Sequence, residues 1–226
     1  MGKYIILSEK YWHLDLFNNL KNTFNEDDWV LINNKTDFTF EKLKEINPNK
    51  IFIPHWSYII SENIFYNYEC ILFHMTDLPY GRGGSPLQNL IIRGHETTKI
   101  SAIKVSAGID TGDIYLKKEL TLKGTAKNIL ISATPIIEKM IIEILHTDMT
   151  PLVQSGEVVE FKRRKPEDGN IINLNNINQI YDFIRMLDCD GYPKAFIEND
   201  FIKIEFSNAE FKSKNNLIAN VRIFKK

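Results

Sequence analysis

The chain has 226 residues, with 28 basic and 29 acidic side chains and a formal net charge of −1. A chain of this length can bury a full hydrophobic core, and the charge balance shows no electrostatic footprint for tRNA, DNA or an anionic membrane. Cys70 and Cys189 lack the spacing of a zinc site or of a secreted disulfide framework. No apolar run is long enough to span a bilayer, and the N-terminus is too charged for a signal peptide. We therefore expect a cytoplasmic protein without a metal, a nucleic-acid partner or a membrane partner.

Strands and helices alternate over the first 150 residues. Short β-branched runs predict the strands, and apolar residues at helical spacing predict the helices between them. In chain order the expected elements are a strand at 3–7, a helix at 11–22, a strand at 29–32, a helix at 40–46, a strand at 50–53, a short helix after Ser61, a strand at 70–73, a helix at 87–92, strands at 100–105 and 113–120, and a helix at 125–145. Pro135 predicts a kink in the last helix or a late start near Thr134. This alternation predicts an α/β fold with a mostly parallel sheet covered on both faces.

The composition changes after about residue 150. Residues 151–156 and the charged run KRRKPED at residues 162–168 indicate a solvated linker, and a helix at 177–187 precedes strands at 195–198, 201–206 and 220–224. We expect a first domain at residues 1–150, and a linker with a small α+β C-terminal subdomain at residues 151–226.

Two strand ends carry residues suited to chemistry. His74 follows the strand at 70–73, and Asp110 lies in the run GIDTGD after the strand at 100–105. Ligands of open α/β sheets bind at the carboxyl ends of strands, so His74 could act as a general base that Asp110 orients. The alternative is a strand-end histidine bonded to backbone beside a tight turn.

Other residues suggest binding rather than proton transfer. Arg82, Gly83 and Gly84 stand where a guanidinium or free backbone N–H groups could hold an anion, although Arg82 could equally pair with surface acids. The run PHWSY, with His55, Trp56 and Tyr58, could line a pocket for a flat heterocycle or pack in the core. His13, His95 and His146 have no partners at ligand spacing and are expected at the surface.

Together, the loop that begins at His74 and the loop GIDTGD that contains Asp110 resemble those of the formyltransferases that use 10-formyltetrahydrofolate. The matching residues are His74, Thr76, Leu78-Pro79, Arg82-Gly83, Pro86 and Gln88, followed by Gly108 to Asp113. The similarity runs from about residue 45 to 145 and resumes weakly at RRKPED and at residues 184–196. It implies a Rossmann-like core, His74 as the base for the attacking amine, and Asp110 as the group that keeps His74 correctly protonated. N10-formyltetrahydrofolate is the implied cosubstrate, beside residues 53–58 and 104–110: Ile53, Pro54, His55, Trp56, Tyr58, Lys104, Ala107, Gly108 and Ile109.

Leu72 departs from the family pattern. The family has an asparagine two residues before the histidine, and it stabilises the oxyanion of the tetrahedral intermediate. Loss of such a donor costs about 10²- to 10³-fold in rate. Thr76, His55, a backbone N–H or a water could replace it.

The resemblance leaves the acceptor amine to be inferred from what the chain lacks. A glycine-serine-rich phosphate loop is missing after the first strand, where the chain reads SEKYWHLD, and the tail is short beside that of methionyl-tRNA enzymes. We therefore expect a nucleotide-linked amino sugar for surface glycans, as in the branch linked to pseudaminic acid, with a homodimer allowed. The alternatives are a methionyl-tRNA or glycinamide ribonucleotide formyltransferase, and a folate-binding homologue without catalysis.

Overall fold

A computed structural model describes residues 1–147 and 149–226. The chain forms two compact units, each assembled from separate stretches. The first unit comprises Met1–Arg82, Thr98–Leu120 and Ile131–Glu160, and the second comprises Gly83–Thr97, Thr121–Leu130 and Phe161–Lys226. Each unit therefore contains residues from both sides of position 150, and a functional boundary at that position stays a prediction.

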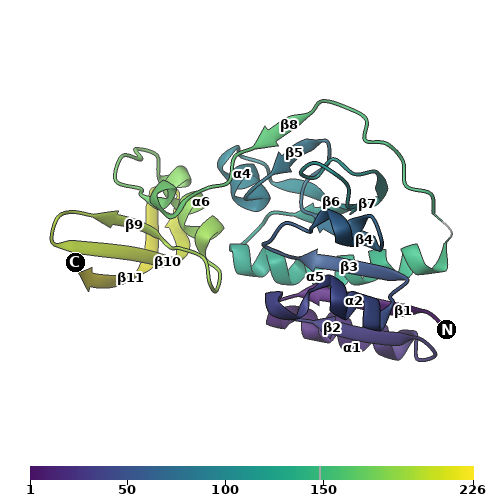
Figure 1. Cartoon of the computed structure of the whole chain (residues 1–226). Coiled ribbons are helices and arrows are strands. Elements are labelled where there is room, and N and C mark those ends of the chain that lie inside the picture. The colour runs from purple at the N-terminus through teal and green to yellow at the C-terminus, as the bar shows by residue number, and fades with distance from the viewer. Residues whose placement is uncertain (148) are drawn as a thin grey trace. The chain divides into compact units, whose positions relative to one another are not determined.

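The first unit is built on a six-stranded sheet in the order β2-β1-β3-β4-β6-β7 (Figure 1). Its strands are β1 (Lys3–Ser8), β2 (Asp28–Ile32), β3 (Lys50–His55), β4 (Glu69–His74), β6 (Thr97–Lys104) and β7 (Ile114–Thr121). Strands β1 to β4 pair in parallel, and β6 is antiparallel to β4. The predicted α/β fold with a mostly parallel sheet is confirmed.

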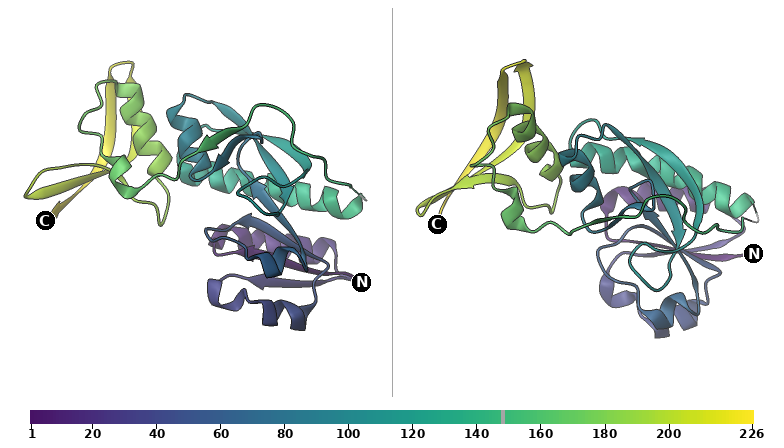
Figure 2. Two further views of the ribbon diagram at one scale, coloured as in Figure 1. Left: turned by 45° about the horizontal axis from the view of Figure 1, so that its top comes forward. Right: turned by 90° about the horizontal axis from the view of Figure 1, so that it is seen from above.

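Helices cover both faces of this sheet (Figure 2). They are η1 (Tyr11–His13), α1 (Leu14–Thr23), η2 (Lys35–Asp37), α2 (Phe40–Ile46), α3 (Glu62–Phe65) and α5 (Ala126–His146). Helices α1 and α5 share one face, where Asn19 Nδ2 donates to Glu138 Oε2 at 3.0 Å. On the other face, Leu43 of α2 and Ile64 of α3 join Ile5, Leu7, Ile51 and Ile53 in one buried cluster. Burial on both faces explains why these strands read as continuous apolar runs.

Helix α5 begins at Ala126 and continues through Pro135, so the alternative of a late start near Thr134 is wrong. Its first turn is capped by Thr125 and Asn128. Thr125 N donates to Asn128 Oδ1 at 3.1 Å, and Asn128 N donates to Thr125 Oγ1 at 3.2 Å. These two bonds satisfy backbone groups that a helix start leaves free.

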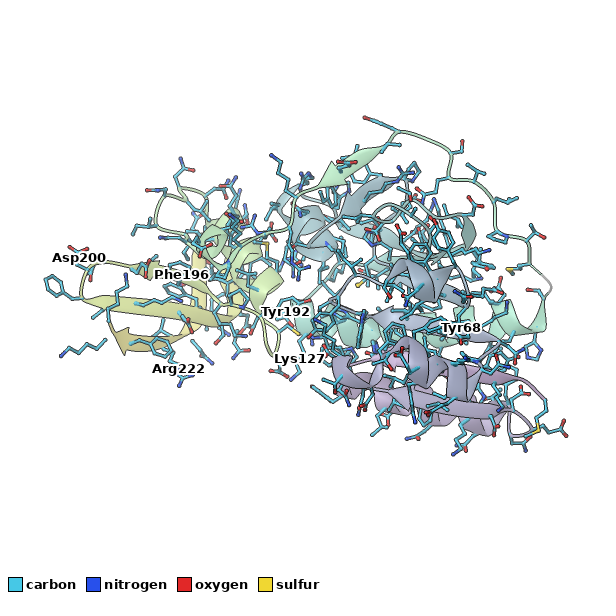
Figure 3. All side chains as sticks on the ribbon, in the orientation of Figure 1. Tyr68, Lys127, Tyr192, Phe196, Asp200 and Arg222 are labelled. Atoms are coloured by element: carbon cyan, nitrogen blue, oxygen red, sulfur yellow. The ribbon has the colours of Figure 1, made fainter. Side chains whose placement is uncertain are left out.

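The second unit contains α4 (Pro86–Ile92), η3 (Pro166–Gly169) and α6 (Ile177–Leu187) with an antiparallel sheet in the order β11-β10-β9. The strands are β9 (Ala195–Glu198), β10 (Ile202–Ser213) and β11 (Asn216–Lys225). Figure 3 marks Phe196 on β9 and Arg222 on β11. Helix α6 packs against β10, where the Tyr181 and Phe211 ring centroids lie 5.0 Å apart.

Several strands differ from the prediction. Strands β10 and β11 extend beyond the expected 201–206 and 220–224, because their added residues mix polar with apolar side chains such as Phe211 and Leu217 and form no continuous apolar run. Strands β5 (Tyr80–Gly83) and β8 (Val159–Phe161) form a two-stranded sheet from segments expected to be loop and linker. Among the described residues, no helix is long and apolar enough to cross a membrane.

Candidate functional site

Parallel strands bring three polar residues to one edge of the first unit's sheet. Ser8 ends β1, His55 ends β3 and His74 ends β4. Ser8 is in register with His55, and Ile53 is in register with Leu72, so His55 and His74 follow at the same level. This edge is where open α/β sheets bind ligands.

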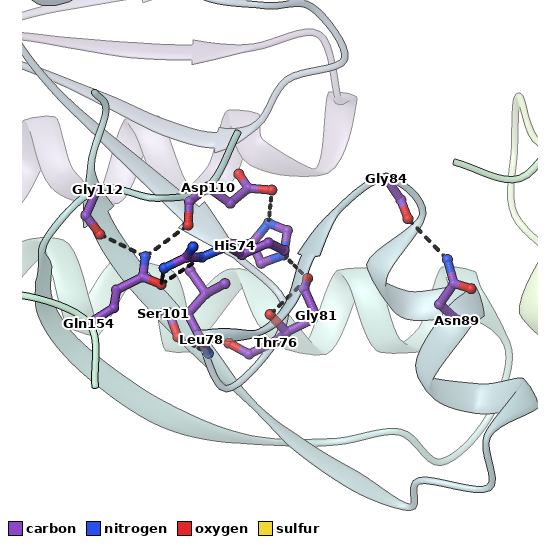
Figure 4. A network of polar contacts seen from close by, with 11 residues as sticks. His74, Thr76, Leu78, Gly81, Gly84, Asn89, Ser101, Asp110, Gly112 and Gln154 are labelled. Carbon is purple, nitrogen blue, oxygen red and sulfur yellow. Dashed lines mark hydrogen bonds and ion pairs between the residues drawn. The ribbon is translucent and has the colours of Figure 1, made fainter. Parts of the chain in front are cut away.

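His74 is almost fully buried, and both of its ring nitrogens have partners within the chain (Figure 4). Nδ1 lies 3.5 Å from Asp110 Oδ2, and Nε2 lies 2.8 Å from the Gly81 carbonyl oxygen. A carbonyl oxygen only accepts hydrogen bonds, so Nε2 carries a proton in this arrangement. The Asp110 carboxylate can accept a hydrogen bond from Nδ1 when that nitrogen also carries a proton. The structure thus brings together the two residues predicted to act as base and orienting acid.

The loop after His74 is fixed by side chains of the neighbouring strands. Ser101 Oγ donates to the Thr76 carbonyl at 2.7 Å and accepts from Leu78 N at 3.3 Å. Asp77 pairs with Lys99 at 2.9 Å and with Lys117 at 2.5 Å. Burial raises the pKa of Asp77, but hydrogen bonds and charge from the two lysines outweigh it and lower the pKa overall. These contacts fix the loop between His74 and the strand β5 that carries Gly81.

The loop that carries Asp110 has unusual backbone geometry. Asp110 has φ +54° and Gly108 has φ +98°, a region that favours glycine. Gly112 passes so close to β6 that a Cβ atom there would lie 1.6 Å from the Lys104 carbonyl oxygen. Only glycine fits position 112, and this close approach explains the GIDTGD spacing.

Gln154 is a site residue that sequence analysis missed. Its Nε2 donates to the carbonyl oxygens of Asp110 and Gly112, each at 2.8 Å. Its Oε1 accepts from Arg82 Nε at 3.0 Å and from Arg82 Nη2 at 2.7 Å. Arg82, predicted to hold an anion, therefore binds Gln154 in this structure. No sequence signal marked Gln154, which lies in the segment expected to be a solvated linker.

The residues expected to bind folate divide into two groups. Ile53 and Pro54 are buried in β3, so only their backbone can meet a ligand, whereas His55 and Trp56 are half-buried and Tyr58 is 40% exposed. The Trp56 ring lies edge-on to Tyr58 and Phe38, at 5.2 and 5.9 Å between centroids. Lys104, Ala107, Gly108 and Ile109 are exposed on the Asp110 loop. Trp56 and Val105 pack against the same core cluster, and folate binding by these residues stays a prediction.

Thr76 and His55 are two candidates to replace the missing oxyanion donor, and their environments differ. Thr76 is fully buried, and its Oγ1 donates to the Gly81 carbonyl at 3.3 Å. Burial, and then the charge of Lys10, lower the pKa of His55 to about 4. At neutral pH His55 is therefore a neutral imidazole with one N–H to donate.

The expectation that His13 lies at the surface is wrong. His13 is 2% exposed, and its Nδ1 lies 2.7 Å from Ser8 Oγ. Burial, with smaller effects from His55 and Lys10, lowers its pKa to about 3. His146 is exposed as expected, whereas His95 is half-buried.

Gly83 and Gly84, predicted to bind substrate, lie in the second unit. Gly84 N donates to the Phe161 carbonyl at 3.0 Å, and the Gly84 carbonyl accepts from Asn89 Nδ2 at 3.0 Å. Both backbone groups of Gly84 thus serve the local fold. Across residues 1–147 and 149–226, no three or more histidine, cysteine, aspartate or glutamate side chains gather as a metal-binding group.

Comparison with known proteins identifies the family. A solved structure described as methionyl-tRNA formyltransferase from Clostridium thermocellum superposes with a TM-score of 0.97 at 48% sequence identity and covers 100% of both chains. The chain belongs to the formyltransferase family. A family model for the C-terminal domain of methionyl-tRNA formyltransferase also matches residues 166–224 of this formyltransferase.

Curated relatives of the chain are also described as methionyl-tRNA formyltransferases. Methionyl-tRNA formyltransferase from Thermodesulfovibrio yellowstonii is 28% identical over 75% of this chain and 58% of its own length. The enzyme from Clostridium botulinum is 31% identical over 70% of this chain and 53% of its own length. The chain thus spans somewhat more than half the length of these two relatives.

Two further solved structures share only the fold. A sugar N-formyltransferase from Shewanella has a TM-score of 0.71 at 16% identity and covers 88% of this chain and 94% of its own. HypX from Aquifex aeolicus in complex with tetrahydrofolic acid has a TM-score of 0.74 at 16% identity and covers 95% of this chain and 39% of its own. The predicted formyltransferase family and Rossmann-like fold are confirmed.

The predicted acceptor is wrong. The relatives at 48%, 31% and 28% identity are methionyl-tRNA formyltransferases, which contradicts both the amino-sugar substrate and the expectation of no nucleic-acid partner. The tail judged too short for tRNA is matched by the C-terminal domain model of those enzymes. The net charge of −1 was a poor reason to exclude nucleic acid, because the charge is unevenly distributed. Residues 161–226 hold 12 basic and 9 acidic side chains.

Proposed function

We propose that this formyltransferase moves the formyl group of N10-formyltetrahydrofolate to the amino group of methionyl-tRNA. The observation that carries the proposal is the match to the Clostridium thermocellum structure over the whole of both chains. The buried pair of His74 and Asp110 supports it, because amide formation from an amine requires a group that handles a proton.

The proposed reaction balances without a metal or an oxidant. The amine nitrogen bonds to the formyl carbon, the bond from that carbon to N10 breaks, and the amine loses one proton as tetrahydrofolate leaves. We assign the proton transfer to His74. For Nε2 to accept the amine proton, His74 must leave the Gly81 carbonyl and hold its single ring proton on Nδ1, where Asp110 accepts the hydrogen bond, so that the Nε2 lone pair is free.

We also assign supporting roles to neighbouring residues. Trp56 and Tyr58 offer the aromatic surface on which the folate ring would stack, and the backbone at Gly108 would contact its edge. His55, a neutral donor at the same sheet edge, is the replacement that we favour for the family asparagine absent at Leu72. N10-formyltetrahydrofolate would be the donor of the formyl group in this reaction.

The cytoplasm is the compartment that we propose. Both cysteines are free and buried, and burial, with the charge of Glu69, raises the pKa of Cys70 to about 12. Such thiols are inert and suit a reducing compartment.

The full chain should be incubated with N10-formyltetrahydrofolate and methionyl-tRNA while formyl-methionyl-tRNA and tetrahydrofolate are measured. Glycinamide ribonucleotide and uncharged tRNA serve as alternative acceptors. We expect product only with methionyl-tRNA, and a His74→Ala rate lower by about 10²- to 10⁴-fold. Asp110→Asn should bind tetrahydrofolate and turn over poorly, and wild-type turnover in that variant would remove Asp110 from the mechanism.

Other outcomes separate the alternatives. Transfer to glycinamide ribonucleotide but not to methionyl-tRNA would overturn the proposed acceptor. Tetrahydrofolate binding without transfer to any acceptor, at a rate equal to that of His74→Ala, would instead mark a folate-binding homologue without catalysis.

A further inference from the structure

The side-chain amide of Gln154 has every hydrogen-bonding position filled. An amide offers two N–H donors and an oxygen with two lone pairs. Gln154 Nε2 donates to the Asp110 and Gly112 carbonyls at 2.8 Å each, and Oε1 accepts from Arg82 Nε and Nη2 at 3.0 and 2.7 Å. A half-buried side chain with four such bonds is fixed in one orientation.

The backbone around Gln154 is fixed as well. Two residues earlier, Leu152 forms an isolated antiparallel bridge with Ile114 at the start of β7, with N–O distances of 2.8 and 2.9 Å. Leu152 and Val153 are exposed, as are residues 155–158, whereas Gln154 is half-buried. The bridge thus delivers one inward-facing polar side chain from an otherwise exposed segment.

Gln154 connects the two groups that hold His74. Asp110, which faces His74 Nδ1, is held through its own carbonyl oxygen. Gly81, whose carbonyl accepts from His74 Nε2, is followed directly in β5 by Arg82, the other partner of Gln154. Figure 4 shows the bonds from Gln154 to Asp110 and Gly112, and His74 between Asp110 and Gly81.

The Asp110 loop needs such a restraint. Asp110 has φ +54°, which is a sparsely populated conformation for a residue other than glycine, and such conformations persist where the surroundings hold them. Its carboxylate lies 3.5 Å from Nδ1, at the outer limit of a useful contact, so a small rotation of the loop would separate the pair.

We propose that Gln154 is a positioning residue, which with Arg82 holds the Asp110 loop and the Gly81 strand at the spacing that keeps His74 between them. The inference rests on the proposed transferase function, because it assigns Gln154 a role in that same reaction. The Gln154 side chain contacts Arg82 and the Asp110 and Gly112 carbonyls, so its effect passes to His74 through these neighbours.

Gln154→Glu tests this role with almost no change in shape. The carboxylate keeps an acceptor for Arg82 but loses both N–H donors and places negative charge against the Asp110 and Gly112 carbonyls. We expect kcat to fall by about 10- to 100-fold, with KM for N10-formyltetrahydrofolate within about 2-fold of the wild type. The pH dependence of kcat should also change, which a purely structural role would not cause.

Gln179→Glu is the matched control. It makes the same chemical change at an exposed position of α6 and should leave kcat, KM and the pH profile unchanged. A double-mutant cycle of Gln154→Leu and Arg82→Leu adds a second test. If the two side chains act as one unit, the double variant should be no slower than the slower single variant.

The closing experiment separates failure of the inference from failure of the proposed function. The ¹⁵N resonances of the His74 ring, recorded across pH, should differ between wild type and Gln154→Glu but not between wild type and Gln179→Glu. Unchanged resonances, or unchanged kcat in an active enzyme, would overturn the positioning role. Altered resonances in a wild-type protein that transfers no formyl group would keep that role for the His74 geometry while rejecting the transferase function.

Discussion

Leu72 lies on strand β4 two residues before His74, so both side chains point to the same face of the sheet. It pairs in register with Ile53 and Ile103 and packs half-buried against the core cluster. An amide at this position would lie beside His74, where the family asparagine polarises the formyl oxygen. Leu72 is therefore the position at which the family's oxyanion donor is absent and at which His55 would have to replace it.

We predict that Leu72→Asn raises kcat by about 10-fold or more, because the amide would add a second donor to the one that His55 supplies, and a well-placed oxyanion donor contributes about 10²- to 10³-fold. Steady-state transfer to methionyl-tRNA gives the measurement. Leu72→Ala is the control, since it removes the same side chain and adds no donor. An unchanged kcat in a folded Leu72→Asn protein would mean that His55 or another donor already performs the task.

The low pKa of His13 predicts that the folding stability of the protein falls at acidic pH. Burial, with His55 and Lys10, lowers its pKa to about 3, whereas the unfolded chain has an ordinary histidine with a pKa near 6.5. The unfolded state therefore binds more protons between about pH 6.5 and 3, so stability falls as pH falls through this window. By pH 4 the loss from His13 should be about 3 kcal/mol.

Urea unfolding of His13→Gln at pH 8 and pH 4 tests this effect. The variant is expected to be less stable at pH 8, where it loses the bond to Ser8, but to lose less stability than the wild type on acidification. Exposed His146→Gln should behave as the wild type does. Equal pH dependence in His13→Gln and wild type would contradict the assignment.

Among the elements, the strands that the sequence predicts best are those buried on both faces. Strands β1, β3 and β4 are short apolar runs with no competing helical period, and their ends place His55 and His74. Strands β5 and β8 escape prediction because they hold three or four residues each, and the first contains two glycines. Helix α5 starts at the reciprocal bonds of Thr125 and Asn128 and continues through Pro135, so the proline does not set its start.

The same contrast divides the candidate site. His74 and Asp110 follow strands and belong to a recognisable pattern, so sequence reasoning can pair them. Gln154 reaches Arg82, Asp110 and Gly112 across 72, 44 and 42 residues of chain. No local pattern encodes contacts over such separations, and only the folded chain places this amide at the site.

At the scale of the whole molecule, the distribution of charge matters more than its sum. Residues 161–226 have a net charge of +3 and residues 1–160 a net charge of −4, although the total is −1. Lys162, Arg163 and Lys165 are exposed, whereas Arg164 is half-buried, donates to the Asp168 carbonyl and lies 5.2 Å from the Phe183 ring. The three exposed side chains are thus available for phosphates, while Arg164 serves the local fold.

We predict that binding of methionyl-tRNA weakens as salt rises, because basic side chains release counterions from the phosphates that they neutralise. A Lys162→Gln, Arg163→Gln, Lys165→Gln triple variant should bind more weakly, and the slope of log K against log salt should decrease in magnitude by about 2 to 3. The measurement is a series of binding titrations at several salt concentrations. Transfer to a minimal methionyl acceptor without the tRNA body should keep its kcat.

The control is a triple variant of Lys21, Lys42 and Lys44 to glutamine, which removes the same charge from exposed positions of the first unit. If net charge alone governed binding, both triple variants would weaken it equally. If the second unit supplies the phosphate contacts, only the variant in residues 162–165 should change the salt slope. An unchanged slope in that variant would exclude this run from the tRNA-binding surface, and the search would move to the basic residues of β10 and β11.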